Sequence, residues 1–184
     1  MQVTPESTPN PATMKFNFSE AIVEGTHDFP TAVEAERSPL ASKIFGFPWT
    51  SGVFLGPNFI SVTKQDWVDW EVLAEPLAGL IREHLDSGSP ILVERLEVSE
   101  SADDEHATDT EIVKKIKRIL KNEIRPVVAM DGGDVAFASY QDGVLALQMK
   151  GSCAGCPSKS ATLKDGIEVR FREVLPEIKE VIAV

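Results

Sequence analysis

The chain has 184 residues, 42% of them hydrophobic, and carries a net charge of −11 at pH 7. These values fit one or two folded domains and exclude a chain that is disordered throughout. The acidity argues against a nucleic-acid partner, because phosphate binding needs a basic face. The sequence has no apolar run of membrane-spanning length, no signal peptide and no Arg-rich transit segment. We therefore expect a cytoplasmic protein with no nucleic-acid or membrane partner.

The first part of the chain mixes strand and helix patterns. Prolines at positions 5, 9 and 11 predict an irregular start. Ser38 and Pro39 are typical of a helix N-cap and first helical residue. The Gly56-Pro57-Asn58 turn between two apolar runs predicts a hairpin. The predicted elements are a strand over 14–18, a helix over 38–45, strands over 53–55 and 59–63, and a helix over 71–85.

Pro76 lies inside the last of these helical patterns. Because proline lacks a backbone N–H and clashes in a helix interior, we expect this helix to start near Ala74 or Glu75. Trp49, Trp67 and Trp70 could form a partner-docking face, but core packing is favoured for at least one of them. Trp67 and Trp70 would share one side of a helix. Residues 91–98 are interpreted as a final strand or an extended lead into a linker. The isolated histidines are expected at the surface or in that linker: His27, His84 and His106.

The clearest boundary is the segment 99–109, which reads SESADDEHATD. It is polar and acidic and lacks large apolar residues, so burial cannot offset the entropy of ordering it. The sequence therefore predicts an acidic linker at 99–109 between a domain over 1–98 and a second domain over 110–184.

The second domain has a clear order of elements. Asp142-Gly143 between two β-rich runs is a strong hairpin signal. The predicted elements are a helix over 110–124, strands over 135–140 and 144–149, a helix over 159–175 and a strand over 178–184. This order of helix, strand, strand, helix, strand lets two helices pack on one face of a small sheet. The fold class is therefore expected to be α+β, with two small α+β domains joined by the linker.

The only two cysteines, Cys153 and Cys156, are three positions apart, between a predicted strand and a predicted helix. Pro157 favours the first helical position, which would place Cys156 near the N-cap. The helix dipole and unsatisfied N–H groups there favour thiolate, the form that binds metal. Gly155 permits the tight turn that points both sulfurs to one place.

Cysteine spacing of this kind serves iron–sulfur clusters, structural zinc and dithiol redox chemistry. The alternative without function is that both cysteines are simply small hydrophobic side chains buried in the core. A cluster or structural zinc needs about four protein ligands, and this chain offers two sulfurs. Two chains could supply two thiolates each, a small thiol could complete the shell, or a redox dithiol could need no further ligand.

Two segments of each domain carry a family resemblance. GSCAGCPSKSATLKDGIE (151–168), preceded by MDGGDV (130–135), resembles the C-terminal domain of the NifU-like, or Nfu, family. STPNPATMKF (7–16) and GVFLGPNFISVTK (52–64) resemble the N-terminal domain of Nfu proteins. The resemblance supports a structural role for the Asp131-Gly132-Gly133-Asp134 turn close to the cysteine loop, rather than a metal-binding acidic loop.

The resemblance implies a carrier or scaffold, not an enzyme. Cys153 and Cys156 would be the cofactor-binding and metal-ligating residues, with no catalytic residues. They would hold a 4Fe-4S cluster that bridges two protomers of a homodimer. An upstream assembly scaffold would donate the cluster, and apo iron–sulfur proteins would receive it. The alternative from the same motif is a dithiol/disulfide oxidoreductase or a zinc-binding module.

Overall fold

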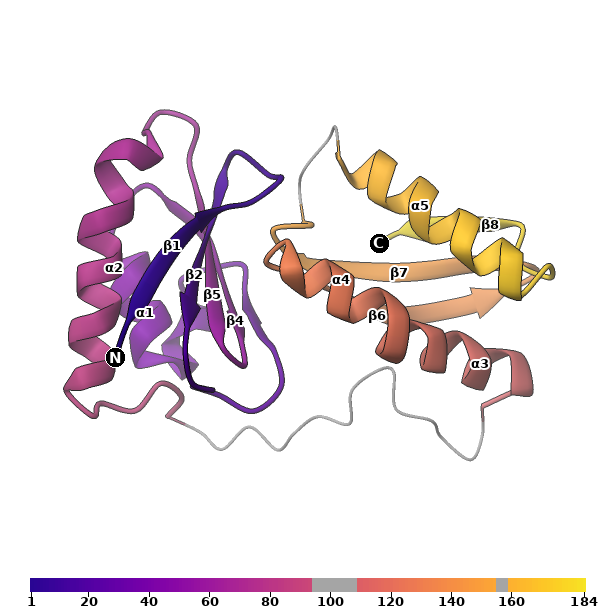
Figure 1. Cartoon of the computed structure of the whole chain (residues 1–184), viewed down its shortest axis with the longest axis horizontal. Coiled ribbons are helices and arrows are strands. Elements are labelled where there is room, and N and C mark those ends of the chain that lie inside the picture. The colour runs from indigo at the N-terminus through magenta and orange to yellow at the C-terminus, as the bar shows by residue number, and fades with distance from the viewer. Residues whose placement is uncertain (94–108, 155–158) are drawn as a thin grey trace. The chain divides into compact units, whose positions relative to one another are not determined.

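The computed structural model describes residues 1–93, 109–154 and 159–184, the side chains of 159–164 excepted. It divides into two compact units, Met1–Val98 and Ser99–Val184, which we call the N-terminal unit and the C-terminal unit (Figure 1). Each unit combines a sheet with helices, so the α+β class predicted from the sequence is confirmed. The predicted linker lies outside the described residues, except for Asp109. No helix of the described ranges is long and apolar enough to cross a membrane.

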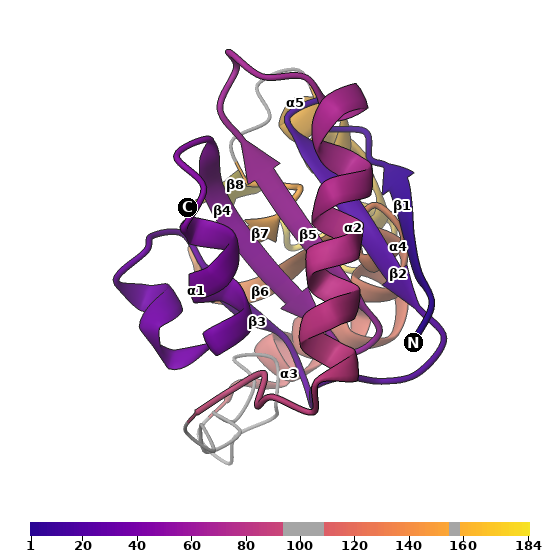
Figure 2. The ribbon, with the colours of Figure 1, turned by 90° about the vertical axis from the view of Figure 1, so that its left-hand side faces the viewer.

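The N-terminal unit is built on one antiparallel sheet with strand order β1-β2-β5-β4-β3. Figure 2 shows α2 lying along one face of this sheet, and the buried side chains of the sheet and of α1 and α2 form one core. The bounds are β1 (Val3–Ser7), β2 (Thr13–Phe18), β3 (His27–Phe29), the 3₁₀ turn η1 (Glu34–Arg37), α1 (Pro39–Phe45), β4 (Thr50–Gly56), β5 (Phe59–Lys64) and α2 (Trp70–Asp86).

Several local predictions for this unit are confirmed. The strand at 14–18 is β2, and the two predicted strands around Gly56-Pro57-Asn58 are β4 and β5. Ser38 caps α1, because its hydroxyl oxygen accepts a hydrogen bond from the Ala41 N–H at 3.1 Å. The same hydroxyl donates to the Ile91 carbonyl at 2.6 Å, which fixes the chain after α2 against the start of α1.

One prediction about proline is wrong in part and another is wrong. The start of the chain is irregular at Pro9 and Pro11, between β1 and β2, but β1 runs through Pro5, which lies opposite Phe16. Because β1 is an edge strand that pairs only with β2, it tolerates a residue without an N–H. Helix α2 starts at Trp70 rather than near Ala74, with Pro76 inside it. Pro76 is on the exposed side of the helix, where the carbonyl that loses its donor can reach water.

The tryptophans also depart from the predicted pattern. Trp67 precedes α2 and is 66% exposed, so it does not share a helical side with Trp70. Trp70 packs edge-on against Phe16 and Trp49, with ring centroids 6.5 and 6.3 Å away. Trp49 is buried, as expected for core packing. The shared helical side predicted for Trp67 and Trp70 is therefore wrong, and the docking patch stays a hypothesis.

His84 is the largest surprise in this unit, because it is only 1% exposed rather than a surface residue. Its ring Nε2 lies 3.2 Å from the Pro90 carbonyl oxygen, a distance that suits an Nε2–H donor. Its Nδ1 is buried with no hydrogen-bond partner among the residues that the structure describes. Protonation of Nδ1 would therefore bury a donor without an acceptor, and this burial lowers the pKa of His84.

We expect the N-terminal unit to lose stability in mild acid. Because the folded-state pKa of His84 lies below the ordinary value of 6.5, the unfolded chain binds the proton first as the pH falls. The free energy of unfolding is thus unaffected by His84 above about pH 6.5. Below that pH it declines by at most about 1.4 kcal/mol per pH unit. Denaturant unfolding followed by tryptophan fluorescence measures this, since all three tryptophans are in this unit. His84→Phe should flatten the dependence of the free energy of unfolding on pH, and the control His27→Gln should keep it. An unchanged pH dependence in His84→Phe contradicts the prediction.

The C-terminal unit has a three-stranded sheet with order β6-β7-β8, in which β6 and β7 are antiparallel and β7 and β8 parallel. The helices pack on this sheet around a buried core that includes Ile116, Val135 and Phe171 (Figure 1). The predicted order of helix, strand, strand, helix, strand is confirmed. The bounds are α3 (Glu111–Ile119), the π-helical turn η2 (Leu120–Ile124), α4 (Arg125–Met130), β6 (Gly133–Gln141), β7 (Val144–Gly151), α5 (Lys159–Val174) and β8 (Glu180–Ala183).

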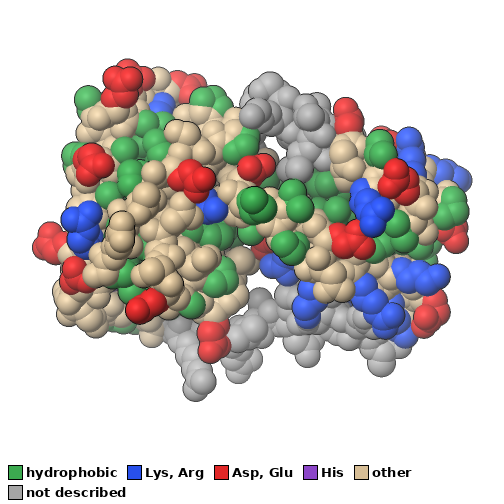
Figure 3. All heavy atoms as spheres, in the orientation of Figure 1, with side chains coloured by type: hydrophobic (Ala, Val, Ile, Leu, Met, Phe, Trp, Pro, Cys, Tyr) green, Lys and Arg blue, Asp and Glu red, His purple; other side chains and the backbone are tan. Residues whose placement is uncertain are grey.

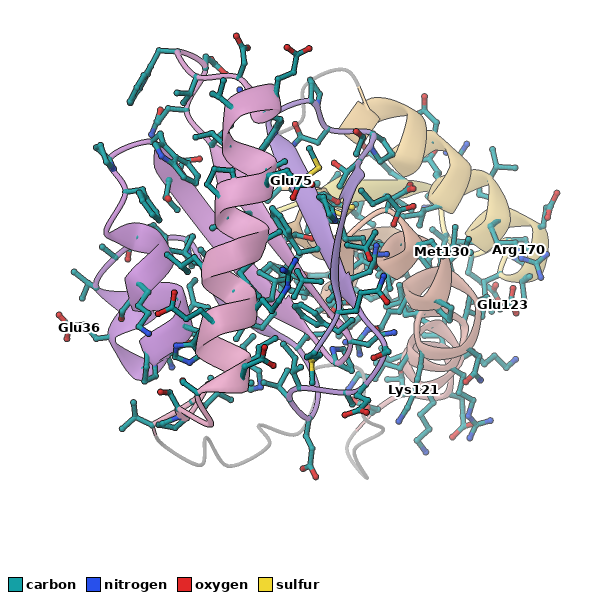
Figure 4. The ribbon with its side chains drawn as sticks, turned by 60° about the vertical axis from the view of Figure 1, so that its left-hand side comes forward. Glu36, Glu75, Lys121, Glu123, Met130 and Arg170 are labelled. Carbon is teal, nitrogen blue, oxygen red and sulfur yellow. The ribbon has the colours of Figure 1, made fainter. Side chains whose placement is uncertain are left out.

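The first helical segment of this unit is longer than predicted, because it continues past Ile124 as α4. Pro126 occupies one of the first two positions of α4, where a missing N–H is tolerated, and the π turn precedes it. Glu123 in η2 accepts hydrogen bonds at 2.7 and 2.8 Å from Arg170 of α5. Figure 4 labels this pair at the contact between the two helical segments.

Candidate metal centre

Cys153 lies in the turn that follows β7, two residues after Gly151. Its side chain is half-buried and packs against the core of the C-terminal unit. Cys156 and Pro157 lie outside the described residues, and α5 begins at Lys159. The pairing of the two sulfurs and the place of Cys156 beside the helix N-cap therefore stay predictions.

The turn around Cys153 is tied to the turn between α4 and β6. The Ser152 hydroxyl donates to the Asp131 carbonyl at 2.5 Å, and the Ser152 N–H donates to the Gly132 carbonyl at 3.2 Å. Within the turn, the Ala154 N–H donates to the Gly151 carbonyl at 3.0 Å. Gly132 and Gly151 both have positive φ, 79° and 62°, which glycine adopts without steric penalty. Backbone geometry on both sides thus fixes the entry to the cysteine motif.

Gly133 gives the cysteine sulfur its room. An added Cβ at Gly133 would lie 2.5 Å from the Cys153 Sγ, 2.9 Å from the Lys150 carbonyl oxygen and 3.1 Å from the Cys153 nitrogen. These separations are far below van der Waals contact, so only glycine fits here with the sulfur where it is. The Gly-Gly turn therefore packs directly on the cysteine loop, in agreement with the structural role expected for it.

A buried ion pair holds this turn to α4. Arg125 donates from Nε and Nη2 to the two carboxylate oxygens of Asp134, at 2.8 and 2.7 Å. The Asp134 side chain is 6% exposed, and its Oδ1 also accepts the Val135 N–H at 2.9 Å. Asp134 is next to Gly133, so the pair sets where β6 begins and where Gly133 meets the sulfur. Sequence reasoning missed Arg125 and the hydrogen bond between Ser152 and Asp131, because only the fold brings these partners together.

One chain shows no complete metal-binding shell in its described ranges, which contain no group of three or more His, Cys, Asp or Glu side chains suited to a metal ion. His27 and His84 belong to the N-terminal unit, and His106 lies outside the described residues. Asp131 and Asp134 belong to no such group in those ranges, and the carboxylate of Asp134 binds Arg125. Of the two cysteines expected as ligands, the described residues include Cys153, so the ligand set stays a prediction.

Comparison with known proteins decides the family. Residues 3–88 match the family model described as "Scaffold protein Nfu/NifU N terminal", and residues 116–182 match the one described as "NifU-like domain". The chain belongs to the NifU-like (Nfu) family. The two matched segments cover most of the chain and occur in the order that the sequence motifs predicted.

Whole proteins of this family resemble the Nfu chain along its length. The human "NFU1 iron-sulfur cluster scaffold homolog, mitochondrial" is 39% identical over 98% of this chain and 71% of its own. The Arabidopsis thaliana "NifU-like protein 5, mitochondrial" is 36% identical over 98% of this chain and 67% of its own. The Drosophila ananassae "NFU1 iron-sulfur cluster scaffold homolog, mitochondrial" is 38% identical over a match that covers 98% of this chain and 63% of that protein. The chain thus spans about two thirds of the length of these relatives.

The names of these relatives correct one expectation. All three are called mitochondrial, which contradicts the cytoplasmic location expected from the start of the sequence. The expectation depended on the lack of a transit segment in a chain that covers only part of its relatives' length.

Proposed function

We propose that this protein is an iron–sulfur cluster carrier or scaffold rather than an enzyme. Cys153 and Cys156 would bind a 4Fe-4S cluster shared with the same two cysteines of a second copy. The cluster would come from an upstream assembly scaffold and pass to apo iron–sulfur proteins. The observation that carries the proposal is the Cys153 turn, a half-buried thiol on a hydrogen-bonded backbone, with no group of three or more metal-binding side chains in the part of the chain that the structure describes.

The site's geometry suits a cargo that must be released. Cys153 is packed against Gly133 and the core on one side, so the thiol does not have to be ordered when a cluster arrives. It remains half-exposed on the other side, which leaves an incoming thiolate of a recipient a path to the metal. Lys150, just before the motif, adds positive charge that favours the thiolate form.

The setting of the motif leaves the dithiol alternative to experiment. A thioredoxin-like CxxC motif belongs to a βαβ unit. Here the motif follows the antiparallel β6–β7 hairpin, but the chain then runs through α5 to β8, which pairs parallel with β7. A chain that takes up neither iron nor zinc would favour the dithiol reading. Zinc is distinguished by experiment, since zinc is colourless and tolerates oxygen, whereas a cluster is coloured and oxygen-sensitive.

The test is anaerobic reconstitution of the full chain with iron and sulfide, followed by visible absorption and analysis of iron, sulfide and zinc. We expect about one 4Fe-4S cluster per two chains. Cys153→Ala and Cys156→Ala should each reduce the cluster content to background, because each removes two of the four ligands from a shared site. Ala154→Ser, which changes an exposed residue inside the same motif, should leave it unchanged.

Two results would reject the proposal. One is a wild-type chain that takes up zinc and no iron or sulfide under these conditions. The other is a Cys153→Ala or Cys156→Ala variant that keeps the wild-type amount of cluster. Transfer is tested separately, by adding an apo iron–sulfur protein to the loaded chain and following the recipient's activity.

A further inference from the structure

The outer face of α4 is apolar and exposed. Val127 and Met130, three residues apart on one side of the helix, are 58% and 73% exposed, and Pro126 beside them is exposed as well. Figure 3 shows apolar side chains gathered over α4. We call the surface of Pro126, Val127 and Met130 the α4 face. Large apolar side chains grouped on a surface in this way mark contact sites.

The α4 face and the cysteine loop are connected by a hydrogen bond and by packing. Met130 is followed directly by Asp131, whose carbonyl accepts the Ser152 hydroxyl at 2.5 Å. Gly133, two residues later, is the residue that packs on the Cys153 Sγ. A partner that supplies ligands at Cys153 therefore comes within a few residues of the α4 face.

Two of the charges beside this face are compensated. Arg125, at the start of α4, is paired with Asp134, and Glu123, in the preceding turn, is paired with Arg170. No charged residue other than Arg125 occurs between positions 124 and 130, and the exposed Asp131 follows at the edge of the face. An apolar face of this kind is complementary to itself, so two copies related by a two-fold axis can bury it against each other while Asp131 stays at the rim, in water.

We propose that the α4 face is the surface through which two copies of this chain meet when they share a cluster. This inference rests on the proposed function, because the second copy is the partner that completes the half ligand set at Cys153 and Cys156. Three side chains per copy are far fewer than the 20–30 or so residues a side of a stable protein interface. The face therefore does not hold two copies together alone, and the dimer forms when the cluster bridges them.

The test is a Val127→Glu/Met130→Glu variant of the full chain, reconstituted anaerobically beside the wild type. Sedimentation gives the mass of the loaded protein over a range of concentrations, and a chelator gives the rate of cluster loss. We expect a loaded wild-type dimer, and dimerisation weakened about tenfold or more in the variant with faster cluster loss, because four carboxylates would face one another. The control is Val169→Glu/Val174→Glu on α5, whose positions are 57% and 44% exposed, and which should behave as wild type.

The outcomes separate this inference from the proposed function. If the wild type takes up no cluster, the proposed function fails and this inference fails with it. If the wild type forms a loaded dimer and the α4 variant forms the same dimer with the same cluster loss, only this inference is overturned. It is also overturned if the variant keeps the dimer but transfers its cluster more slowly, since the face would then receive the recipient protein. Circular dichroism confirms that the exposed substitutions leave the fold intact.

Discussion

Arg125→Met is expected to destabilise the C-terminal unit by about 3–5 kcal/mol, because it leaves the Asp134 carboxylate buried without its counter-ion. The side chain of Asp134 is 6% exposed and cannot turn to water, whereas that of Arg125 is 23% exposed. Asp134→Asn should therefore be milder, since the guanidinium that remains has access to solvent. The double variant should cost less than the sum of the two single changes, as expected for residues that act on each other.

Hydrogen exchange of the β6 and β7 amides in the full chain measures this effect, because the tryptophans report only on the N-terminal unit. The matched control is Glu111→Gln, which removes an ion pair with Lys114 at 3.0 Å in which the carboxylate side is 85% exposed. Such exposed pairs contribute about 0–1 kcal/mol. Equal exchange protection in Arg125→Met and Glu111→Gln would show that the buried pair does not hold β6 in place.

Local chemistry explains what the sequence predicted correctly. Asp142 and Gly143 have φ of 54° and 89°, the positive values that a two-residue hairpin turn requires, so the Asp-Gly signal located the β6–β7 hairpin. Ser38 and Pro39 likewise mark the start of α1 through short-range effects. In each case the residues that decide the structure are neighbours in the chain.

The errors arise where tertiary context decides. Pro5 forbids a central strand but not an edge strand, and only the assembled sheet shows that β1 is at the edge. Pro76 is tolerated because its side of α2 is exposed. The burial of His84 had a signal, since Leu77, Ile81 and His84 recur at positions i, i+4 and i+7 of the same helix and are all buried.

The candidate site also has features that the sequence shows and features that only the fold shows. The cysteine spacing and the Gly-Gly turn were visible in the sequence, and the family resemblance connected them. The groups that hold Cys153 in place could not be predicted from the sequence, because Asp131 and Ser152 are 21 positions apart and meet only when β6 pairs with β7. A sequence therefore identifies the ligands more readily than the residues that orient them.

Gly133→Ala is expected to reduce the cluster content of the reconstituted chain strongly, although it leaves both cysteines in place. The new methyl group would lie 2.5 Å from the Cys153 Sγ and 2.9 Å from the Lys150 carbonyl oxygen, so the cysteine turn or strand β7 must move. Overpacking of this kind costs about 1–3 kcal/mol. Displacement of residues that orient a metal ligand lowers metal affinity about 10–100-fold. The measurement is iron and sulfide per chain, together with the rate of cluster loss to a chelator.

Gly166→Ala is the matched control, because the same added methyl group on α5 of the same unit has open space around it. It should keep the wild-type cluster content and stabilise the helix by about 0.5–1 kcal/mol. Thermal unfolding distinguishes a displaced thiol from a lost fold, since Gly133→Ala should remain folded while its cluster is lost faster. Wild-type cluster content and stability in Gly133→Ala would mean that the loop can move without consequence, and that the contact between Gly133 and Cys153 does not set the geometry of the ligand.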